Sequence, residues 1–297
     1  MENITVLALG GNAIDSDSHK EEGRNILKTL NGIEELVRAG PLVITHGNGP
    51  QVGRLVEQTG LPLWLCAAQT QGEIGTLIFQ NLKRYLSRHK IKKPMVVLQT
   101  HSLINPQDPS LRKPSKPIGV FLNKTEAKKL MKKGYRMERD PSKKTLWRRI
   151  VPSPAPIDIV EKEAIKILLK EYIVITGGGG GVPVYESADG YVPVEAIIDK
   201  DYTSSLIATE IGASKIILLT NVEGVKLNFQ EPNEFLVKTL SKKDAENFIK
   251  KGCFKTGMKS KVEAGVIFLE NGGTEVTIAH TFKLKEVLSD TTGTKIT

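Results

Sequence analysis

Three short apolar runs in this chain each end in a turn built largely from glycine. The turns read GGN after residues 4–9, HGNG after residues 42–45 and GGGGG after residues 172–176. Glycine can adopt positive φ, and it lets a ligand approach the backbone closely. In an open parallel sheet, ligands bind beyond the carboxyl ends of the strands, where helix N-termini expose N–H groups to anions. Three such turns at one edge therefore predict an anion site, and phosphate is the simplest occupant.

Strand-like and helix-like segments alternate along most of the chain. Several of the strand-like runs are apolar throughout, which is typical of strands buried on both faces of a sheet. The pattern predicts an α/β fold, a three-layer αβα sandwich with a mainly parallel central sheet and a small protruding subdomain. Strands are expected at 4–9, 42–45, 95–99, 172–176, 216–219 and 275–279, and helices at 21–39, 71–88, 161–170, 202–211, 242–251 and 259–269.

Residues 106–152 interrupt this alternation, and we call them the lid. The lid is rich in proline and basic residues: residues 112–149 carry a net charge of +11, whereas the rest of the chain has −2. The charge alone is compatible with a solvated surface, with a funnel for an anionic substrate or with a nucleic-acid patch. No nucleic-acid-binding motif accompanies it, so we expect no nucleic-acid partner.

Hydrophobic runs and cysteines indicate where in the cell the protein is expected. No apolar run approaches the roughly 18 residues of a membrane span, and no signal peptide is evident at the N-terminus, so no membrane association is expected. The two cysteines, Cys66 and Cys253, are too few and too far apart for a disulfide framework. They fit a reducing compartment, and we expect a cytoplasmic protein.

Familiar phosphate and metal motifs do not fit the chain. Residues 252–260 have one residue too many for a Walker loop, and the HGNG turn lacks the dinucleotide-binding spacing. We expect His46 to be a structural histidine that bonds its own loop, and not a ligand. The remaining chemistry lies in AIIDKD at residues 196–201. There Lys200 is a candidate phosphate ligand, and Asp201 is either a helix N-cap or a group that orients lysines or Mg²⁺.

Taken together, the motifs resemble those of the carbamate kinases, within the amino acid kinase family. They occur in that family's order and cover nearly the whole chain. Ala8 stands where other members of the wider family have a lysine, and the resemblance implies that Lys116 of the lid supplies the missing charge. The motifs are LALGGNAI, ITHGNGPQVG, KPSKPIGVF, WRRIVPSP, TGGGGGVPV, EAIIDKD, GMKSKVEAG and TIAH.

The resemblance implies one domain over residues 1–297, with a substrate side at 1–105 and 153–176 and a nucleotide side at 177–297. It implies reversible phosphoryl transfer between ATP and carbamate, with Mg²⁺ held mainly by the ATP phosphates and not directly by the protein. ATP synthesis from carbamoyl phosphate, a place in arginine metabolism and a homodimer are further implications. Two alternatives stay open: another kinase of the family, of the acetylglutamate or phosphonate type, and a non-catalytic regulatory paralogue.

The resemblance also assigns residues, position by position. The chain departs from the family pattern at Cys253, at residues 256–260 (TGMKS) and at residues 139–149 of the lid. The implied catalytic residues are Lys116, Lys200, Asp201 and Lys261; the implied substrate-binding residues are Gly10, Gly11, Asn12, Gly47, Asn48 and Gly49; the implied nucleotide-binding residues are Gly178, Gly179, Asp199, Val222, Gly224 and Met258.

Overall fold

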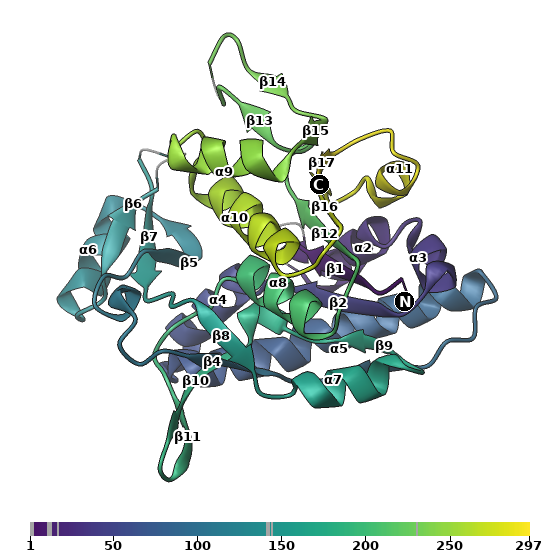
Figure 1. Cartoon of the computed structure of the whole chain (residues 1–297). Coiled ribbons are helices and arrows are strands. Elements are labelled where there is room, and N and C mark those ends of the chain that lie inside the picture. The colour runs from purple at the N-terminus through teal and green to yellow at the C-terminus, as the bar shows by residue number, and fades with distance from the viewer. Residues whose placement is uncertain (1–2, 11–13, 17, 141–142, 144, 230) are drawn as a thin grey trace.

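The fold is built on one eight-stranded sheet, seen in a computed structural model that describes the chain except residues 1–2, 11–13, 17, 141–142, 144 and 230 and the side chains of residues 19 and 256. The strand order is β15-β17-β16-β12-β1-β2-β9-β3 (Figure 1). Every neighbouring pair is parallel except β16 and β17. The strands are β1 (Thr5–Leu9), β2 (Leu42–His46), β3 (Met95–Val97), β9 (Ile173–Ile175), β12 (Lys215–Thr220), β15 (Thr239–Leu240), β16 (Glu275–His280) and β17 (Thr294–Ile296).

Helices cover both faces of this sheet, which confirms the predicted sandwich. Successive residues of a strand point to opposite faces, so β12 places Ile216 in one apolar core and Ile217 in the other. Ile217 packs with α2 (His19–Thr29), α3 (Ile33–Ala39), α5 (Leu63–Arg88) and α11 (Leu284–Leu288). Ile216 packs with α7 (Lys162–Leu169), α8 (Lys200–Glu210), α9 (Lys242–Lys250) and α10 (Thr256–Glu270).

A second, four-stranded sheet lies beside the first and was not predicted. Its order is β11-β10-β4-β8, and its strands are short and partly exposed, so their sequences lack a clear apolar period. The strands are β4 (His101–Ile104), β8 (Pro156–Ile159), β10 (Val182–Ser187) and β11 (Gly190–Pro193). A two-stranded hairpin, β13 (Lys226–Leu227) and β14 (Phe235–Leu236), extends from another part of the body.

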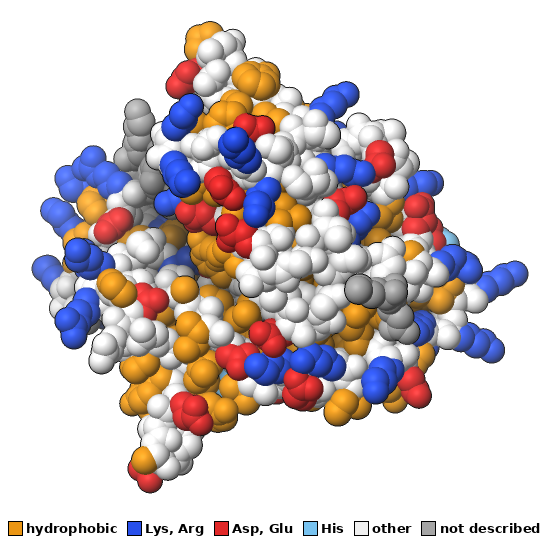
Figure 2. All heavy atoms as spheres, in the orientation of Figure 1, with side chains coloured by type: hydrophobic (Ala, Val, Ile, Leu, Met, Phe, Trp, Pro, Cys, Tyr) orange, Lys and Arg blue, Asp and Glu red, His pale blue; other side chains and the backbone are white. Residues whose placement is uncertain are grey.

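The lid residues lie between β4 and β8 and fold into a small sheet with one helix, on the left of Figure 1. The strand order is β5-β7-β6, and Lys and Arg side chains crowd its outer surface in Figure 2. An apolar cluster joins the lid to the body, because Ile118 and Val151 pack with Val52 and Val56 of α4 (Gly49–Thr59). The lid elements are η1 (Pro109–Leu111), β5 (Lys116–Leu122), α6 (Lys124–Lys132), β6 (Met137–Arg139) and β7 (Trp147–Val151).

Several boundaries differ from the predictions. The helix expected over 21–39 is two helices, because Gly32 adopts a φ of 93° between α2 and α3. The helix expected from residue 71 begins at Leu63, and the one expected from residue 259 begins at Thr256, so the TGMKS stretch is the first turn of α10. Among the described residues, no helix combines the length and apolarity that a membrane span requires.

Candidate functional site

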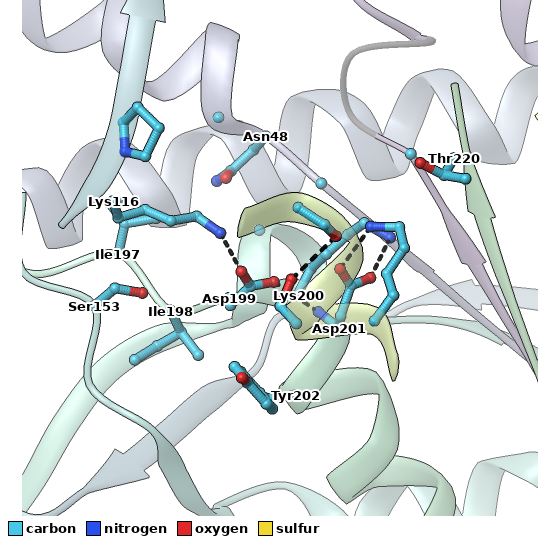
Figure 3. Close-up of a pocket in the computed structure, with 18 of the residues that line it drawn as sticks. Asn48, Lys116, Ser153, Ile197, Ile198, Asp199, Lys200, Asp201, Tyr202 and Thr220 are labelled. Atoms are coloured by element: carbon cyan, nitrogen blue, oxygen red, sulfur yellow. Dashed lines mark hydrogen bonds and ion pairs between the residues drawn. The ribbon is translucent and has the colours of Figure 1, made fainter. Parts of the chain in front are cut away.

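A pocket of about 550 Å³ lies beyond the carboxyl ends of β1, β2 and β12, as parallel-sheet topology requires (Figure 3). Residues from the two halves of the chain and from the lid line it together. The glycine turns contribute Gly10, Gly47, Asn48, Gly49 and Gly179; the lid contributes Ser115, Lys116, Pro117 and Arg148; the α8 and α10 regions contribute Asp199, Lys200, Asp201, Tyr202, Gly257, Lys259, Ser260, Lys261 and Glu263.

Two of the glycine turns pack against each other at the floor of this pocket. A Cβ added to Gly179 would lie 2.0 Å from the Asn48 amide nitrogen, and one added to Gly178 would lie 2.5 Å from His46. Gly179 also has a φ of 60°, which favours glycine. Asn48 is held in place, since its amide donates to Thr70 Oγ1 at 2.9 Å. The close packing explains why residues 178 and 179 are glycines, since any side chain there would clash with His46 and Asn48.

His46 is a structural residue, as predicted. Its ring is buried, and Nδ1 lies 3.2 Å from the carbonyl oxygen of Gly47. Burial lowers the pKa of His46 to about 4, because an imidazolium in this position would lose its hydration. The neutral ring therefore supports the HGNG turn and carries no charge near neutral pH.

Asp201 holds two lysines at the centre of the site. Its carboxylate accepts a hydrogen bond from Lys261 Nζ at 2.7 Å and lies 3.0 Å from Lys200 Nζ. Asp201 is inside α8, while Asp199 is the N-cap and accepts from the Asp201 N–H at 3.1 Å. The N-cap interpretation of Asp201 is therefore wrong. The lysine-orienting interpretation agrees with the geometry.

All three groups of this cluster are buried, so their protonation depends on one another. Burial opposes the charge of Asp201, but the two lysines outweigh it and lower the pKa of the carboxyl. Burial likewise opposes the charge of Lys261, and the Asp201 carboxylate outweighs it and raises the pKa. For Lys200, burial prevails and lowers the pKa. Within the described part of the chain, the Lys200 ammonium makes its ion pair with Asp201 but no aligned hydrogen bond, so it has donors to offer an anion in the pocket.

The lid brings two cations to the pocket. Lys116 Nζ donates to Asp199 Oδ2 at 2.5 Å, which places the lid lysine directly above the start of α8 (Figure 3). Arg148 of β7 also lines the pocket; its Nη2 donates to the Gly119 carbonyl at 3.0 Å, and its buried Nε has no hydrogen-bond partner among the residues that the structure describes. Its neighbour Arg149 stacks over the Tyr135 ring instead.

Most of the predicted site residues line this one pocket, but several do not. Gly11 and Asn12 lie outside the described residues. Gly178 lines a smaller neighbouring cavity, while Val222, Gly224 and Met258 line neither of the two. Gly224 packs on Thr294, and Met258 packs on the apolar core beside α10. The nucleotide roles of these last four residues stay predictions.

Arg148 is a pocket cation of the lid that the sequence interpretation missed. The motif WRRIVPSP contains two adjacent arginines, and in a strand adjacent residues point to opposite faces. The strand period thus indicates that only one of them can face the pocket. It does not say which one, and the basic lid offers many other candidates.

The pocket carboxylates are all paired. Asp199 bonds Lys116, Asp201 holds Lys200 and Lys261, and Glu263 accepts from the Tyr202 hydroxyl at 2.6 Å. Among the described residues, no cluster of three or more histidine, cysteine or acidic side chains is arranged to hold a metal ion. The site is built to receive negative charge.

Several known proteins are similar to this chain in sequence and in fold over nearly their full length. Residues 3–280 match the profile of the amino acid kinase family. The chain is 38% identical to a carbamate kinase of Pyrococcus horikoshii over 100% of both chains, and 39% identical to the Escherichia coli carbamate kinase-like protein YqeA over 100% of this chain and 99% of the other. The structure of Giardia lamblia carbamate kinase bound to AMP-PNP superposes with a TM-score of 0.87 at 30% identity, covering 99% of this chain and 98% of that one.

Proposed function

The chain belongs to the amino acid kinase family, and from this membership we propose that it is a carbamate kinase. It transfers a phosphoryl group reversibly between ATP and carbamate, forming ADP and carbamoyl phosphate. The observation that carries the proposal is the convergence of Lys116, Lys200 and Lys261 with the glycine turns on one pocket. This arrangement suits a reaction whose substrates and transition state are all anionic.

The chemistry needs positioning and charge more than it needs a base. The attacking oxygen of carbamate is already anionic, so no proton has to be removed from it. Phosphoryl transfer then depends on alignment and on neutralising the charge of the transferred group. Lys200 and Lys261, fixed by Asp201, serve the phosphoryl group and the nucleotide phosphates, and the N–H groups of Gly10 and Gly179 are at hand for the oxygens.

We assign the acceptor side of the pocket to the glycine turns of β1 and β2 together with Lys116. Ala8 leaves that side without a lysine from the sheet, and Lys116 reaches the pocket from the lid. Gly47, Asn48 and Gly49 lie at the start of α4, where exposed N–H groups favour an anion. In this structure Lys116 bonds Asp199. When the substrate binds, Lys116 would leave Asp199 and contact the substrate instead.

Mg²⁺ enters this proposal as part of the nucleotide complex. Because each described pocket carboxylate is paired with a lysine or a tyrosine, the metal fits best on the ATP phosphates. Bound there, it would neutralise part of the charge of the phosphates. ATP synthesis from carbamoyl phosphate, a role in arginine metabolism and a cytoplasmic location belong to the same proposal; free Cys66 and Cys253 agree with a reducing compartment.

We also propose a homodimer whose interface lies outside the lid. Its support is the resemblance, together with large apolar side chains that the body exposes at Ile157, Ile167 and Tyr191. Light scattering should return twice the mass of 32.6 kDa at working concentration. A monomer mass would reject the proposed dimer and would leave the proposed reaction unaffected.

A coupled assay tests the activity. Purified protein with MgADP and carbamoyl phosphate should form ATP, and EDTA in this reaction should abolish ATP formation. Because luciferase itself needs Mg²⁺, excess Mg²⁺ is restored before luciferase detects the ATP. Acetylglutamate and small phosphonates with MgATP serve as competing acceptors in parallel reactions. Turnover of one of these, with none of carbamoyl phosphate, would reject the proposal in favour of another kinase of the family. Folded protein that binds ADP but turns over nothing would indicate a regulatory paralogue.

A further inference from the structure

The lid and the body approach each other very closely at a pair of glycines, one on each side. Gly53 of α4 faces Gly119 of β5 so closely that a Cβ added to Gly53 would lie 2.0 Å from the Gly119 Cα and 2.1 Å from its nitrogen. These atoms belong to main chain, so no rotamer change can relieve the clash. A methyl group at Gly53 can be accommodated only if β5 moves away from α4.

The lid side of this contact has a special backbone. Gly119 has a φ of 71°, and the pairing of β5 with β7 is irregular between Ile118 and Leu122. At this irregular point of the strand, the Gly119 carbonyl accepts a hydrogen bond from Arg148 Nη2 at 3.0 Å. Beside the glycine pair, Ile118 is buried in the apolar cluster that includes Val52 and Val56. Glycine contact and apolar cluster together fix how the lid sits on α4.

The contact links two parts of the pocket through short, rigid segments. On the body side, Gly53 follows Gly49 by one turn of α4, and Gly49 lines the pocket. On the lid side, Lys116 precedes Gly119 by three residues on β5, and Arg148 is bonded to Gly119 itself. The distance between the acceptor turn and both lid cations is therefore set at this contact.

We propose that Gly53 and Gly119 are positioning residues for phosphoryl transfer, acting as the joint that places Lys116 and Arg148 over the acceptor side of the pocket. The inference rests on the proposed function. It goes beyond it by giving a role in catalysis to two glycines that have no side chain to offer the substrate. Phosphoryl transfer is sensitive to small displacements, since an error of about 1 Å can cost roughly 100-fold in rate.

The test is Gly53→Ala, with Gly23→Ala as the matched control. Both are helical glycines, but a Cβ at Gly23 meets only the Asn81 side-chain amide, at 3.4 Å. We expect Gly53→Ala to lower kcat/KM for carbamoyl phosphate by roughly 100-fold. Its Kd for ADP should stay within about twofold of the wild type, because the nearest neighbours of Gly53 and Gly119 belong to α4 and β5 and not to the nucleotide side. Gly23→Ala should behave like the wild type in both measurements. Wild-type kinetics for Gly53→Ala, or equal losses in acceptor and ADP binding, would overturn the proposal.

A double-mutant cycle and hydrogen exchange separate positioning from general damage. In the Lys116→Ala background, Gly53→Ala should cost much less than it does alone, because the group it positions is already absent. Full additivity of the two losses would contradict the joint. Amide exchange in β5 should accelerate in Gly53→Ala and not in Gly23→Ala, while β1 and β12 remain protected; unchanged β5 protection would also overturn the proposal.

Hydrogen exchange needs no activity, so it still tests the joint if the wild type fails to use carbamoyl phosphate. In that case the proposed function fails and the joint is judged separately. Should Gly53→Ala not fold, Gly119→Asn provides the second variant. Asparagine tolerates positive φ, and its Cβ would meet Glu57 Oε1 at 3.2 Å and Gly53 Cα at 3.5 Å. We expect this variant to lower kcat/KM for carbamoyl phosphate by less than Gly53→Ala does, with ADP binding unchanged. An unchanged kcat/KM would refute the joint.

Discussion

At the scale of single residues, the site depends on one carboxylate that holds two lysines. The motif AIIDKD and the lysine-rich GMKSK stretch indicate which residues are involved. Their contact could not be read from the sequence, because Asp201 and Lys261 are 60 residues apart and meet only when α8 and α10 pack together. Burial then makes the pairing obligatory, since an unpaired charge in this position is costly.

Replacing either lysine should remove activity and spare the fold. Lys200→Ala and Lys261→Ala each delete one charged stabiliser of the transition state, a loss of roughly 100- to 1,000-fold in kcat. Lys200→Arg should rescue poorly, because a planar guanidinium does not replace a compact ammonium. Steady-state kinetics measure the loss, and circular dichroism checks the fold. A near-unchanged rate for either alanine variant would show that its contact with Asp201 is structural only.

His46 should make stability depend on pH. Its pKa is about 4 in the folded protein and 6.5 in a free side chain, so the unfolded chain binds the proton more tightly. The neutral His46 ring therefore contributes fully to the free energy of unfolding above pH 6.5. This contribution, roughly 3 kcal/mol in total, is lost as the pH falls toward 4. Urea unfolding across this window gives the slope. His46→Gln should flatten it, and an equal slope in the variant would contradict the assignment.

At the scale of secondary-structure elements, the central βα units were predictable and the lid was not. The central strands are buried on both faces, so their apolar runs stand out, and glycine marks where they end. The lid strands and those of the second sheet are half-exposed and bounded by prolines, so their residues carry little period. The lid was predicted as an inserted basic, protruding subdomain that carries Lys116, but neither its strand order nor the inward face of Arg148 followed from the sequence.

The lid's charge predicts a dependence on salt. With a net charge of +11 over residues 112–149, the lid should attract anionic substrates over a distance that ions in solution shorten. We expect kcat/KM for carbamoyl phosphate to fall severalfold between low and physiological ionic strength. Charge reversal at Lys128 and Lys132 of α6, which do not line the pocket, should reduce both the low-salt rate and its salt dependence. A salt response unchanged by these substitutions would leave the lid charge without a role in association.

At the scale of the whole molecule, the prediction of an αβα sandwich is confirmed because parallel strands with apolar residues on both faces require a helical layer on each side. The relative placement of the lid and the two halves could not be predicted. It arises from contacts between distant segments, such as Gly53 with Gly119 and Gly179 with Asn48, whose glycines carry no pattern that identifies their partners.

The division of the interior into two cores has a consequence for how mutations combine. Ile216 and Ile217 are neighbours in the chain, yet the sheet separates their side chains as a partition would. Ile216→Val and Ile217→Val should each cost about 1 kcal/mol, and their sum should hold in the double variant within about 0.5 kcal/mol. Ile216 and Val276 are 60 residues apart, but they pair across β12 and β16 and lie in the same core. The variants Ile216→Val and Val276→Ala should therefore show coupling when they are combined. Denaturant titration of both sets would therefore find independence between adjacent residues and dependence between distant ones, so that sequence distance is a poor guide to epistasis in this protein.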